Sequence, residues 1–180
     1  MTDLLFAPES GAVCVFFGDG RGKTSAALGQ VMLAVEAGLS CHIIFFMKAT
    51  RRGGEYMSLT RLPRVTFESY GRPGFMGASD TTVEDIRLAR EALEQASLIL
   101  EKSNYNLVVL DEIINAVGYG LISVEDVLVL LSRRKPITTV ILTGKSIDRK
   151  LDEIADVIIE FKKIKHPYDK GILARHGIDY

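Results

Sequence analysis

Short apolar runs alternate with amphipathic segments along most of the chain. The apolar runs are nearly continuous and end at glycine or polar residues, which is typical of parallel strands buried on both faces. They predict strands at residues 11–17, 41–47, 65–68, 106–112, 137–142 and 156–161. Apolar positions at helical spacing predict helices at residues 23–37, 81–100, 123–131 and 148–155. The alternation predicts one doubly wound α/β domain, with a mainly parallel sheet and helices on both faces.

Residues at the expected helix ends support these assignments. Gly38 is placed to end the first helix in a left-handed conformation. Thr81 and Glu84 have the spacing of a capping box before the long second helix, and Ser123 and Asp126 have it before the third.

The stretch FFGDGRGKTS, residues 16–25, follows the first strand and opens the first helix. Its three alternate glycines permit positive φ angles that turn backbone N–H groups toward an anion. Lys23 adds charge for phosphate oxygens, and Thr24 offers a hydroxyl to a magnesium ion. We interpret the stretch as a P-loop of RecA-like type that is one residue short, since only three residues separate Gly18 from Gly22. The alternative is a glycine-rich surface turn with a chance Lys-Thr pair.

Polar residues also follow the other expected strands. Asp111 and Glu112 end an apolar strand in the form of a Walker B segment, where an acid can hold magnesium opposite Thr24. Solvated charges at a strand end are the alternative. Because ligands bind at the carboxyl ends of parallel strands, residues 48–55 are a candidate second wall of the site, with an ordinary connection left open. Lys145 lies in a further polar turn on that side.

A glycine-rich segment, residues 70–77, carries Phe75 and Met76. Apolar side chains on a loop without a regular element suggest a cover for an apolar ligand. Packing of these side chains under a long loop is the alternative.

Composition limits the remaining classes. With 180 residues, 47% of them hydrophobic, the chain can bury a sizeable core, and nothing indicates disorder. A formal net charge of −1 gives no general attraction to nucleic acid. No apolar run approaches the length of a membrane span, and no signal segment is evident, so a cytoplasmic protein is expected. The spacing of residues assigns no nucleophile and base pair, so covalent catalysis has no candidate.

Taken together, these motifs resemble the P-loop ATP:corrinoid adenosyltransferases over nearly the whole chain. The matching segments are the short loop at residues 18–24, Phe46-Met47-Lys48, Gly54-Glu55, the strand at 108–112, HPYDKG at 166–171 and GIDY at 177–180. The resemblance implies transfer of the 5′-deoxyadenosyl group of ATP to the Co(I) of a reduced corrinoid, of cobalamin or cobinamide type, with release of triphosphate. It also implies one domain over residues 1–180, whose tail, 162–180, packs near the site.

The resemblance further implies the substrates, cofactor and partners. ATP is the co-substrate, Mg²⁺ or Mn²⁺ the metal, and a flavoprotein or flavin the reductant; a homodimer is expected, without nucleic acid or membrane. Lys23, Thr24 and Glu112 are expected to be catalytic, and Thr24, Asp111 and Glu112 to attend the metal. The expected ATP-binding residues are Gly18, Asp19, Gly20, Arg21, Gly22, Lys23, Thr24, Ser25, Lys48, Glu55 and Lys145.

Phe75 and Met76 are the expected corrinoid-binding residues. Two positions depart from the family pattern. The chain has no tryptophan where the family has Phe-Thr-Trp, and Lys145 stands where the family has an arginine, which loses the bidentate fork. The competing interpretations are a RecA-like ATPase or small kinase, and a nucleotide-gated carrier of a corrinoid.

Overall fold

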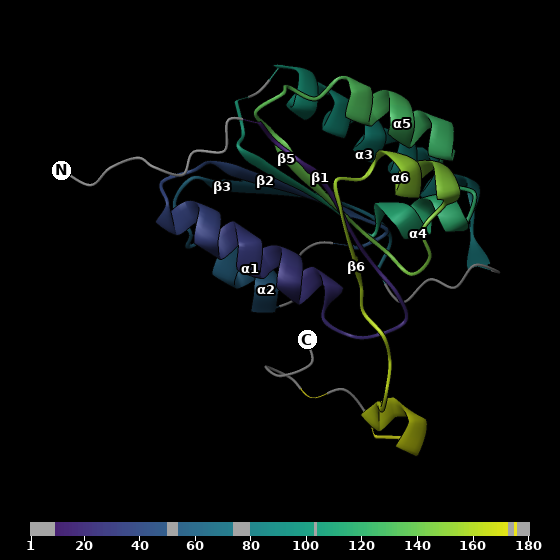
Figure 1. Cartoon of the computed structure of the whole chain (residues 1–180). Helices are drawn as coiled ribbons and strands as arrows, with labels where there is room; N and C mark the ends of the chain where they lie inside the picture. The colour runs from purple at the N-terminus through teal and green to yellow at the C-terminus, as the bar shows by residue number, and fades with distance from the viewer. Residues whose placement is uncertain (1–9, 50–53, 74–79, 103, 173–174, 176–180) are drawn as a thin grey trace.

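The computed structural model describes residues 10–49, 54–73, 80–102, 104–172 and 175 (Figure 1). The strands are β1 (Val13–Phe17), β2 (Cys41–Phe46), β3 (Val65–Tyr70), β4 (Leu107–Asp111), β5 (Thr139–Thr143) and β6 (Val157–Glu160). The helices are α1 (Lys23–Glu36), α2 (Gly54–Leu59), α3 (Val83–Lys102), α4 (Ile113–Gly118), α5 (Val124–Ser132), α6 (Arg149–Ile154) and the 3-10 helix η2 (Pro167–Lys170).

The strands form one parallel sheet in the order β3-β2-β4-β5-β1-β6. Helices α1 and α2 cover one face, and α3, α4, α5 and α6 cover the other (Figure 1). Both faces of the central strands are therefore buried, and every residue of β2 and β4 is buried. This explains why these strands read as continuous apolar runs. The predicted fold class is confirmed.

The parallel direction of the strands decides where the site can be. Every segment that follows a strand leaves from the same edge of the sheet, the carboxyl edge. The P-loop after β1, Lys48 after β2, Glu112 after β4 and Lys145 after β5 therefore meet at one edge. Strand β5 lies between β1 and β4, so the P-loop strand and the acidic strand are one strand apart.

The chain after β2 differs from the sequence-based assignment at two places. Residues 54–59 form helix α2, which the sequence pattern did not predict, because Tyr56 and Leu59 pack into the core on the α1 side. Six residues are too few for a helical period to be recognised in the sequence. Strand β3 also extends to Tyr70, beyond the predicted end at residue 68, since its pairing with β2 continues.

The helix ends agree with expectation at two sites and differ at one. Gly38 has φ of 77°, and Ser123 forms a capping box with residue 126 before α5. The cap of α3 is shifted by one residue from the predicted pair. The backbone N–H of Asp85 donates to Thr82 Oγ1 at 3.4 Å, and Asp85 Oδ2 accepts from the Thr82 N–H at 2.8 Å. A tertiary contact of Asp85, described below, explains the shift.

Among the residues that the structure describes, no helix is both long and apolar enough to cross a bilayer. Cys14 and Cys41 are free thiols, as their positions in apolar strands predict. Burial raises the pKa of the Cys41 thiol to about 11, so this thiol is inert at neutral pH.

Candidate functional site

The P-loop leaves the first turn of α1 open to an anion. Gly22, the N-cap residue, has φ of 108° and makes no side-chain capping bond. The backbone N–H groups that begin at Lys23 therefore lack a capping side chain as partner. A helix N-terminus of this kind, preceded by a glycine loop, suits phosphate groups.

The sequence suggested one role for all three loop glycines, but the structure gives them different roles. Gly18 and Gly22 have positive φ angles, but Gly20 does not. A Cβ on Gly20 would lie 2.5 Å from the carbonyl oxygen of Phe161, and one on Gly18 would lie 2.4 Å from the same atom. The N–H of Gly20 donates to that oxygen at 2.6 Å. Gly20 is therefore required by the close approach of the chain after β6, which sequence analysis could not foresee.

Lys23 lies at the mouth of the loop. Its Nζ donates to the carbonyl oxygens of Gly18 and Gly20, each at 2.7 Å. Burial lowers the pKa of this ammonium, while Glu112 and Asp111 act in the opposite direction. Lys23 therefore curls back over its own loop, within reach of any phosphate bound there.

Asp111 is the centre of the site. Its side chain is fully buried at the end of β4. Oδ1 accepts from Thr24 Oγ1 at 2.9 Å and from Thr143 Oγ1 at 2.7 Å, and Oδ2 accepts from Lys48 Nζ at 2.6 Å. The structure thus brings together three predicted residues from the P-loop, β4 and the segment after β2.

Lys48 is held by several acids. Burial alone would lower the pKa of its ammonium, but the charge of Asp111, followed by Glu112 and Glu55, raises the pKa above the ordinary value. Its backbone carbonyl accepts a hydrogen bond from the Ser69 hydroxyl. Lys48 therefore lies against the buried acid, on the side where one interpretation of the sequence placed a second wall of the site. Glu55, at the start of α2, lies close enough to act on Lys48.

Glu112 has a constrained backbone. Its φ of 64° lies in the left-handed region, and its N–H donates to Thr143 Oγ1 at 2.8 Å. Asn115 donates through Nδ2 to its carboxylate, and burial together with the charge of Asp111 raises the pKa of that carboxyl. Met47, which precedes Lys48, has a similar φ of 56°. Such strain in non-glycine residues beside buried charged groups is characteristic of functional sites.

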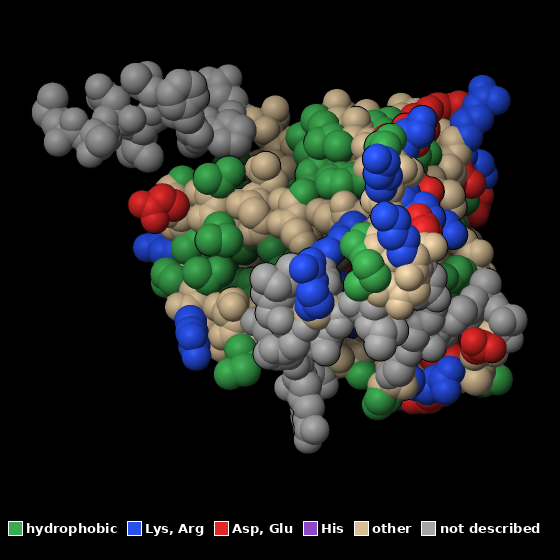
Figure 2. All heavy atoms as spheres, turned by 90° about the horizontal axis from the view of Figure 1, so that it is seen from below, with side chains coloured by type: hydrophobic (Ala, Val, Ile, Leu, Met, Phe, Trp, Pro, Cys, Tyr) green, Lys and Arg blue, Asp and Glu red, His purple; other side chains and the backbone are tan. Residues whose placement is uncertain are grey.

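The outer part of the site carries lysines. Asp19 Oδ1 accepts from the Lys163 N–H at 3.1 Å, and this contact lowers the pKa of Asp19. The N–H of Lys145 donates to Asn115 Oδ1 at 2.7 Å. A hollow of about 740 Å³ beside the loop is lined in part by Lys145, Lys162 and Lys163. Figure 2, the view from below, shows several exposed Lys and Arg side chains on this face of the molecule.

The other expected residues divide into two groups. Arg21 and Ser25 are exposed on the P-loop and the first turn of α1. Phe75 and Met76 lie outside the described residues. A second hollow, of about 480 Å³ between α3 and α5, is lined by none of the expected site residues.

Thr143 and Asn115 are site residues to which the sequence assigned no role. The Thr143 hydroxyl, at the end of β5, donates to Asp111 and accepts from the backbone N–H of Glu112. Asn115 lies three residues after Glu112 in α4, a spacing at which helical side chains meet. That spacing was the available signal.

The oxygens at this edge fit a magnesium ion that also binds phosphates. Mg²⁺ prefers oxygen ligands and usually combines one or two carboxylates with phosphate oxygens and water. The Thr24 hydroxyl and the carboxylate of Asp111 are adjacent at the mouth of the loop, and Glu112 follows directly. The donor set therefore suits such an ion.

Comparisons with known proteins show which family the whole chain resembles. Residues 9–180 match the family described as ATP:corrinoid adenosyltransferase BtuR/CobO/CobP. The corrinoid adenosyltransferase of Escherichia coli (strain K12) is 35% identical over 172 residues, which are 96% of this chain and 87% of that protein. The corrinoid adenosyltransferase CobA of Salmonella typhimurium (strain LT2) is 33% identical over 172 residues, which are also 96% of this chain and 87% of that protein. A corrinoid adenosyltransferase of Sinorhizobium sp is 31% identical over 175 residues, 96% of this chain and 81% of that protein.

Proposed function

Because the chain belongs to the ATP:corrinoid adenosyltransferase family, we propose that its carboxyl edge transfers the 5′-deoxyadenosyl group of ATP to the Co(I) of a reduced corrinoid in cobalamin metabolism. The bond between C5′ and the triphosphate oxygen breaks as the Co–C5′ bond forms. Cobalt supplies the electron pair of the new bond, and triphosphate leaves with the pair of the broken one. The corrinoid is of cobalamin or cobinamide type.

One observation carries the proposal for the ATP end of the site. The Thr24 hydroxyl, in the first turn of α1, donates to Asp111 at the end of β4 at 2.9 Å. This contact joins the P-loop to the acidic strand across the intervening β5. A polyphosphate over the loop would therefore lie beside a buried acid.

The chain's own groups have two tasks in this reaction. The N–H groups of the first turn of α1 and the ammonium of Lys23 bind the phosphates and reduce the charge that grows on the leaving triphosphate. The loop and its neighbours also hold C5′ in line with cobalt, which makes the attack effectively intramolecular. Co(I) is itself a strong nucleophile, so no protein group has to remove a proton.

We further propose that Thr24, Asp111 and Glu112 hold Mg²⁺ or Mn²⁺ together with the phosphates. The ion would neutralise charge on the triphosphate. Lys48 bonds to Asp111 at 2.6 Å and lies 3.5 Å from the Thr24 hydroxyl. Its ammonium therefore competes for the oxygens that the ion would use.

The corrinoid end of the proposal rests on residues 75 and 76. We propose that Phe75 and Met76 cover the lower face of the corrin, without the tryptophan of the family pattern. We also propose that residues 1–180 form one domain whose tail, from residue 162, completes the site. Gly20 and Asp19 already contact the chain at residues 161 and 163. A homodimer, a flavin or flavoprotein reductant and a cytoplasmic location belong to the same proposal.

The experiment is an anaerobic reaction of the purified protein with ATP, Mg²⁺ and chemically prereduced cob(I)alamin. The proposal predicts loss of the Co(I) absorbance and formation of an alkylcobalamin that light cleaves. ATP hydrolysis without any change in the corrinoid would instead support an ATPase or kinase. Binding of both molecules without turnover would support a carrier.

A further inference from the structure

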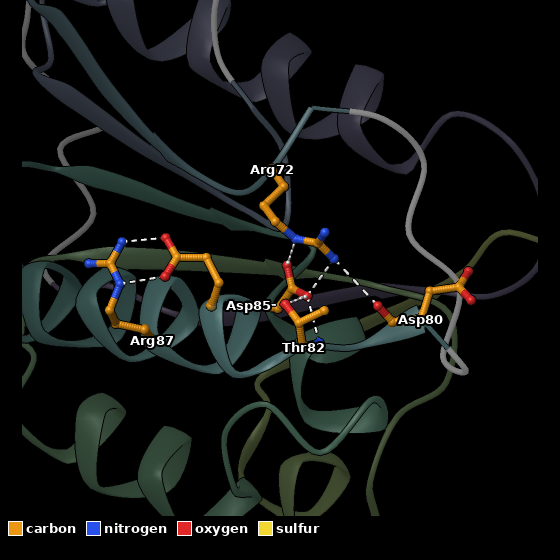
Figure 3. A network of polar contacts seen from close by, with 6 residues as sticks. Arg72, Asp80, Thr82, Asp85 and Arg87 are labelled. Atoms are coloured by element: carbon orange, nitrogen blue, oxygen red, sulfur yellow. Dashed lines mark hydrogen bonds and ion pairs between the residues drawn. The ribbon is translucent and has the colours of Figure 1, made fainter.

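Edge strand β3 is attached to α3, and to the chain just after α3, at two points. At the carboxyl edge, Arg72, which follows β3, contacts Asp85 in the first turn of α3. Its Nε lies 2.7 Å from Oδ1, and its Nη2 lies 2.7 Å from Oδ2. Figure 3 shows the guanidinium pointing at this carboxylate, whose side chain is fully buried. We call this pair the ionic link.

The ionic link keeps its charges at neutral and mildly acidic pH. Hydrogen bonds from Arg72, together with those from Thr82, lower the pKa of Asp85 to about 2. The guanidinium of an arginine stays protonated throughout this range. The carboxyl end of β3 therefore remains attached to α3.

At the opposite edge of the sheet, the amino edge, the attachment is made of uncharged groups. His42 Nδ1 lies 2.7 Å from Thr66 Oγ1, and the same oxygen lies 2.7 Å from the hydroxyl oxygen of Tyr105. The rings of His42 and Tyr105 are also neighbours, with centroids 5.2 Å apart. The three residues come from β2, β3 and the segment between α3 and β4. We call them the neutral link.

One ring nitrogen of His42 decides which charge state the neutral link accepts. The residue is only 2% exposed, and within the described part of the chain its Nε2 has no hydrogen-bond partner. A neutral imidazole can leave one nitrogen as an unused acceptor, but an imidazolium donates from both nitrogens. A buried charged donor without an acceptor is costly. The link is therefore compatible with neutral His42 alone.

Few charged groups surround His42. Glu68, two residues after Thr66 on β3, is the charge that favours protonation of the ring. On the other side, β4 places Val108 beside His42. Helix α4, which also packs near β2, has no charged residue, and the charged residues at this end of α3, Glu101 and Lys102, are exposed. No second carboxylate in the described chain is thus positioned to stabilise an imidazolium here.

We propose that His42 is an acid-sensitive switch for edge strand β3: protonation of its ring opens the neutral link and frees the amino end of β3, while the ionic link holds the carboxyl end. Strand β3 is the element that moves, because β2 is its one neighbour in the sheet. Tyr105 is held independently, since its carbonyl accepts from Thr138 Oγ1 at 2.9 Å. The proton then reaches water by an opening between β2 and β3.

The pH range follows from the burial of the ring. Burial lowers the pKa of His42 below its ordinary value of 6.5, although Glu68 acts in the opposite direction. The opened form therefore takes up the proton first as the pH falls. The stabilisation is fully present above pH 6.5 and is lost as the pH falls through the lower pKa of the closed form. Uptake of one proton can increase opening by at most about tenfold per pH unit.

The test is residue-resolved amide hydrogen exchange of the whole protein at about pH 7.5 and about pH 5.5, on either side of the ordinary histidine pKa. Protection factors, which compare each exchange rate with that of an unfolded chain at the same pH, are measured for the amides of β3 that pair with β2. Protection at residues 65–67 should fall about tenfold between the two pH values. Protection at residues 68–70 should change less than about twofold, because the ionic link persists. No substrate is needed, so the result does not depend on the proposed function.

Two histidine variants separate the switch from a general effect of acid. In His42→Asn the carboxamide can still bond to Thr66 but does not titrate, so protection at residues 65–67 should be the same at both pH values. His166→Asn removes a histidine from the segment after β6 and should behave as wild type. If His42→Asn does not fold, His42→Phe, which keeps a ring in the site, replaces it with the same expected result.

Three results would overturn the inference. The first is equal protection of residues 65–67 at the two pH values in wild type. The second is an equal fall at both ends of β3, which would indicate a loss of global stability. The third is a fall in the His42 variant as large as that in wild type.

Discussion

Two buried aspartates, Asp111 and Asp85, lie at the same edge of the sheet, and each is paired with a cation. The two cations differ in how rigidly they hold the carboxylate. Asp111 binds one cation and two threonine hydroxyls, Asp85 binds one cation and one threonine hydroxyl, and neither side chain is exposed. The cation of Asp85 is an arginine that bonds both carboxylate oxygens. The cation of Asp111 is a lysine, a point charge bonded to a single oxygen. The planar guanidinium of an arginine fixes the geometry of the ion pair, whereas the ammonium on the flexible lysine side chain can move away from the carboxylate.

The partners also differ in their distance along the chain. Thr82 lies three residues before Asp85, and Arg72 lies thirteen before it. Thr24 and Lys48 lie 87 and 63 residues from Asp111. Asp85 therefore organises one local turn and the strand end beside it. Asp111 joins elements that only the completed sheet brings together, which suits a site where several substrate groups must be held at once.

The largest effect is expected on the Asp111 side. Lys23→Ala removes the ammonium at the mouth of the P-loop and should lower the rate of adenosyl transfer about 10³-fold, the loss expected for a preorganised charge on a leaving group. Stability should change little, since within the described part of the chain the hydrogen bonds of Lys23 Nζ go to carbonyls of its own loop. Transfer from prereduced cob(I)alamin and thermal unfolding measure the two quantities. Retention of wild-type transfer would remove Lys23 from the mechanism.

The next effect separates the two acids. Asp111→Asn should lower transfer about 10²-fold, and by leaving Lys48 without its counter-charge it should reduce the free energy of unfolding by about 3 kcal/mol. Asp85→Asn should destabilise the protein as well, yet retain the wild-type rate at saturating corrinoid. Rates at saturation and urea unfolding of both variants make the comparison. Equal rate losses would mean that the two acids share one role.

Lys48→Arg tests whether the cation paired with Asp111 must be easily displaced from that carboxylate. An arginine would keep the charge but can bond both carboxylate oxygens. The Mg²⁺ concentration for half-maximal transfer should therefore rise about tenfold, with the thermal unfolding temperature preserved. A magnesium dependence equal to that of wild type would show that the lysine's point charge is not required.

The smallest effect is a pH dependence on the Asp85 side. Hydrogen bonds from Arg72, together with those from Thr82, lower the pKa of Asp85 from 3.8 to about 2 although burial opposes the shift. Because the folded pKa is depressed, the stabilisation is present above pH 3.8 and is lost as the pH falls toward 2. The stability difference between wild type and Arg72→Met should therefore narrow between pH 4 and 2. Urea unfolding across this range measures it, and a constant difference would contradict the assigned pKa.

The sequence predicted those features that depend on neighbours in the chain. The continuous apolar runs identified the strands, and the glycine loop before α1 identified Lys23 and Thr24. The resemblance to the family, carried by short motifs, added the reaction. The pairing of Thr24 with Asp111 could be expected only as a consequence of the parallel sheet, and its 2.9 Å contact is a property of the fold.

The features that were missed depend on contacts across the fold. The expected capping pair before α3 was Thr81 with Glu84, whereas the structure forms the cap between Thr82 and Asp85. Arg72, which lies thirteen residues before Asp85, bonds to that carboxylate and so favours the later cap. Gly20 needs to be glycine because of a carbonyl that is 141 residues away in sequence, at Phe161. No local pattern contains either fact.

The most direct test of the account is the identity of the phosphate product in the anaerobic reaction with ATP and cob(I)alamin. If the P-loop and its neighbours hold the three phosphates as one leaving group, each alkylcobalamin formed is accompanied by one triphosphate, detectable by ³¹P NMR. Release of orthophosphate with ADP, in amounts unrelated to the corrinoid, would contradict the account and would identify the site as one for phosphoryl transfer.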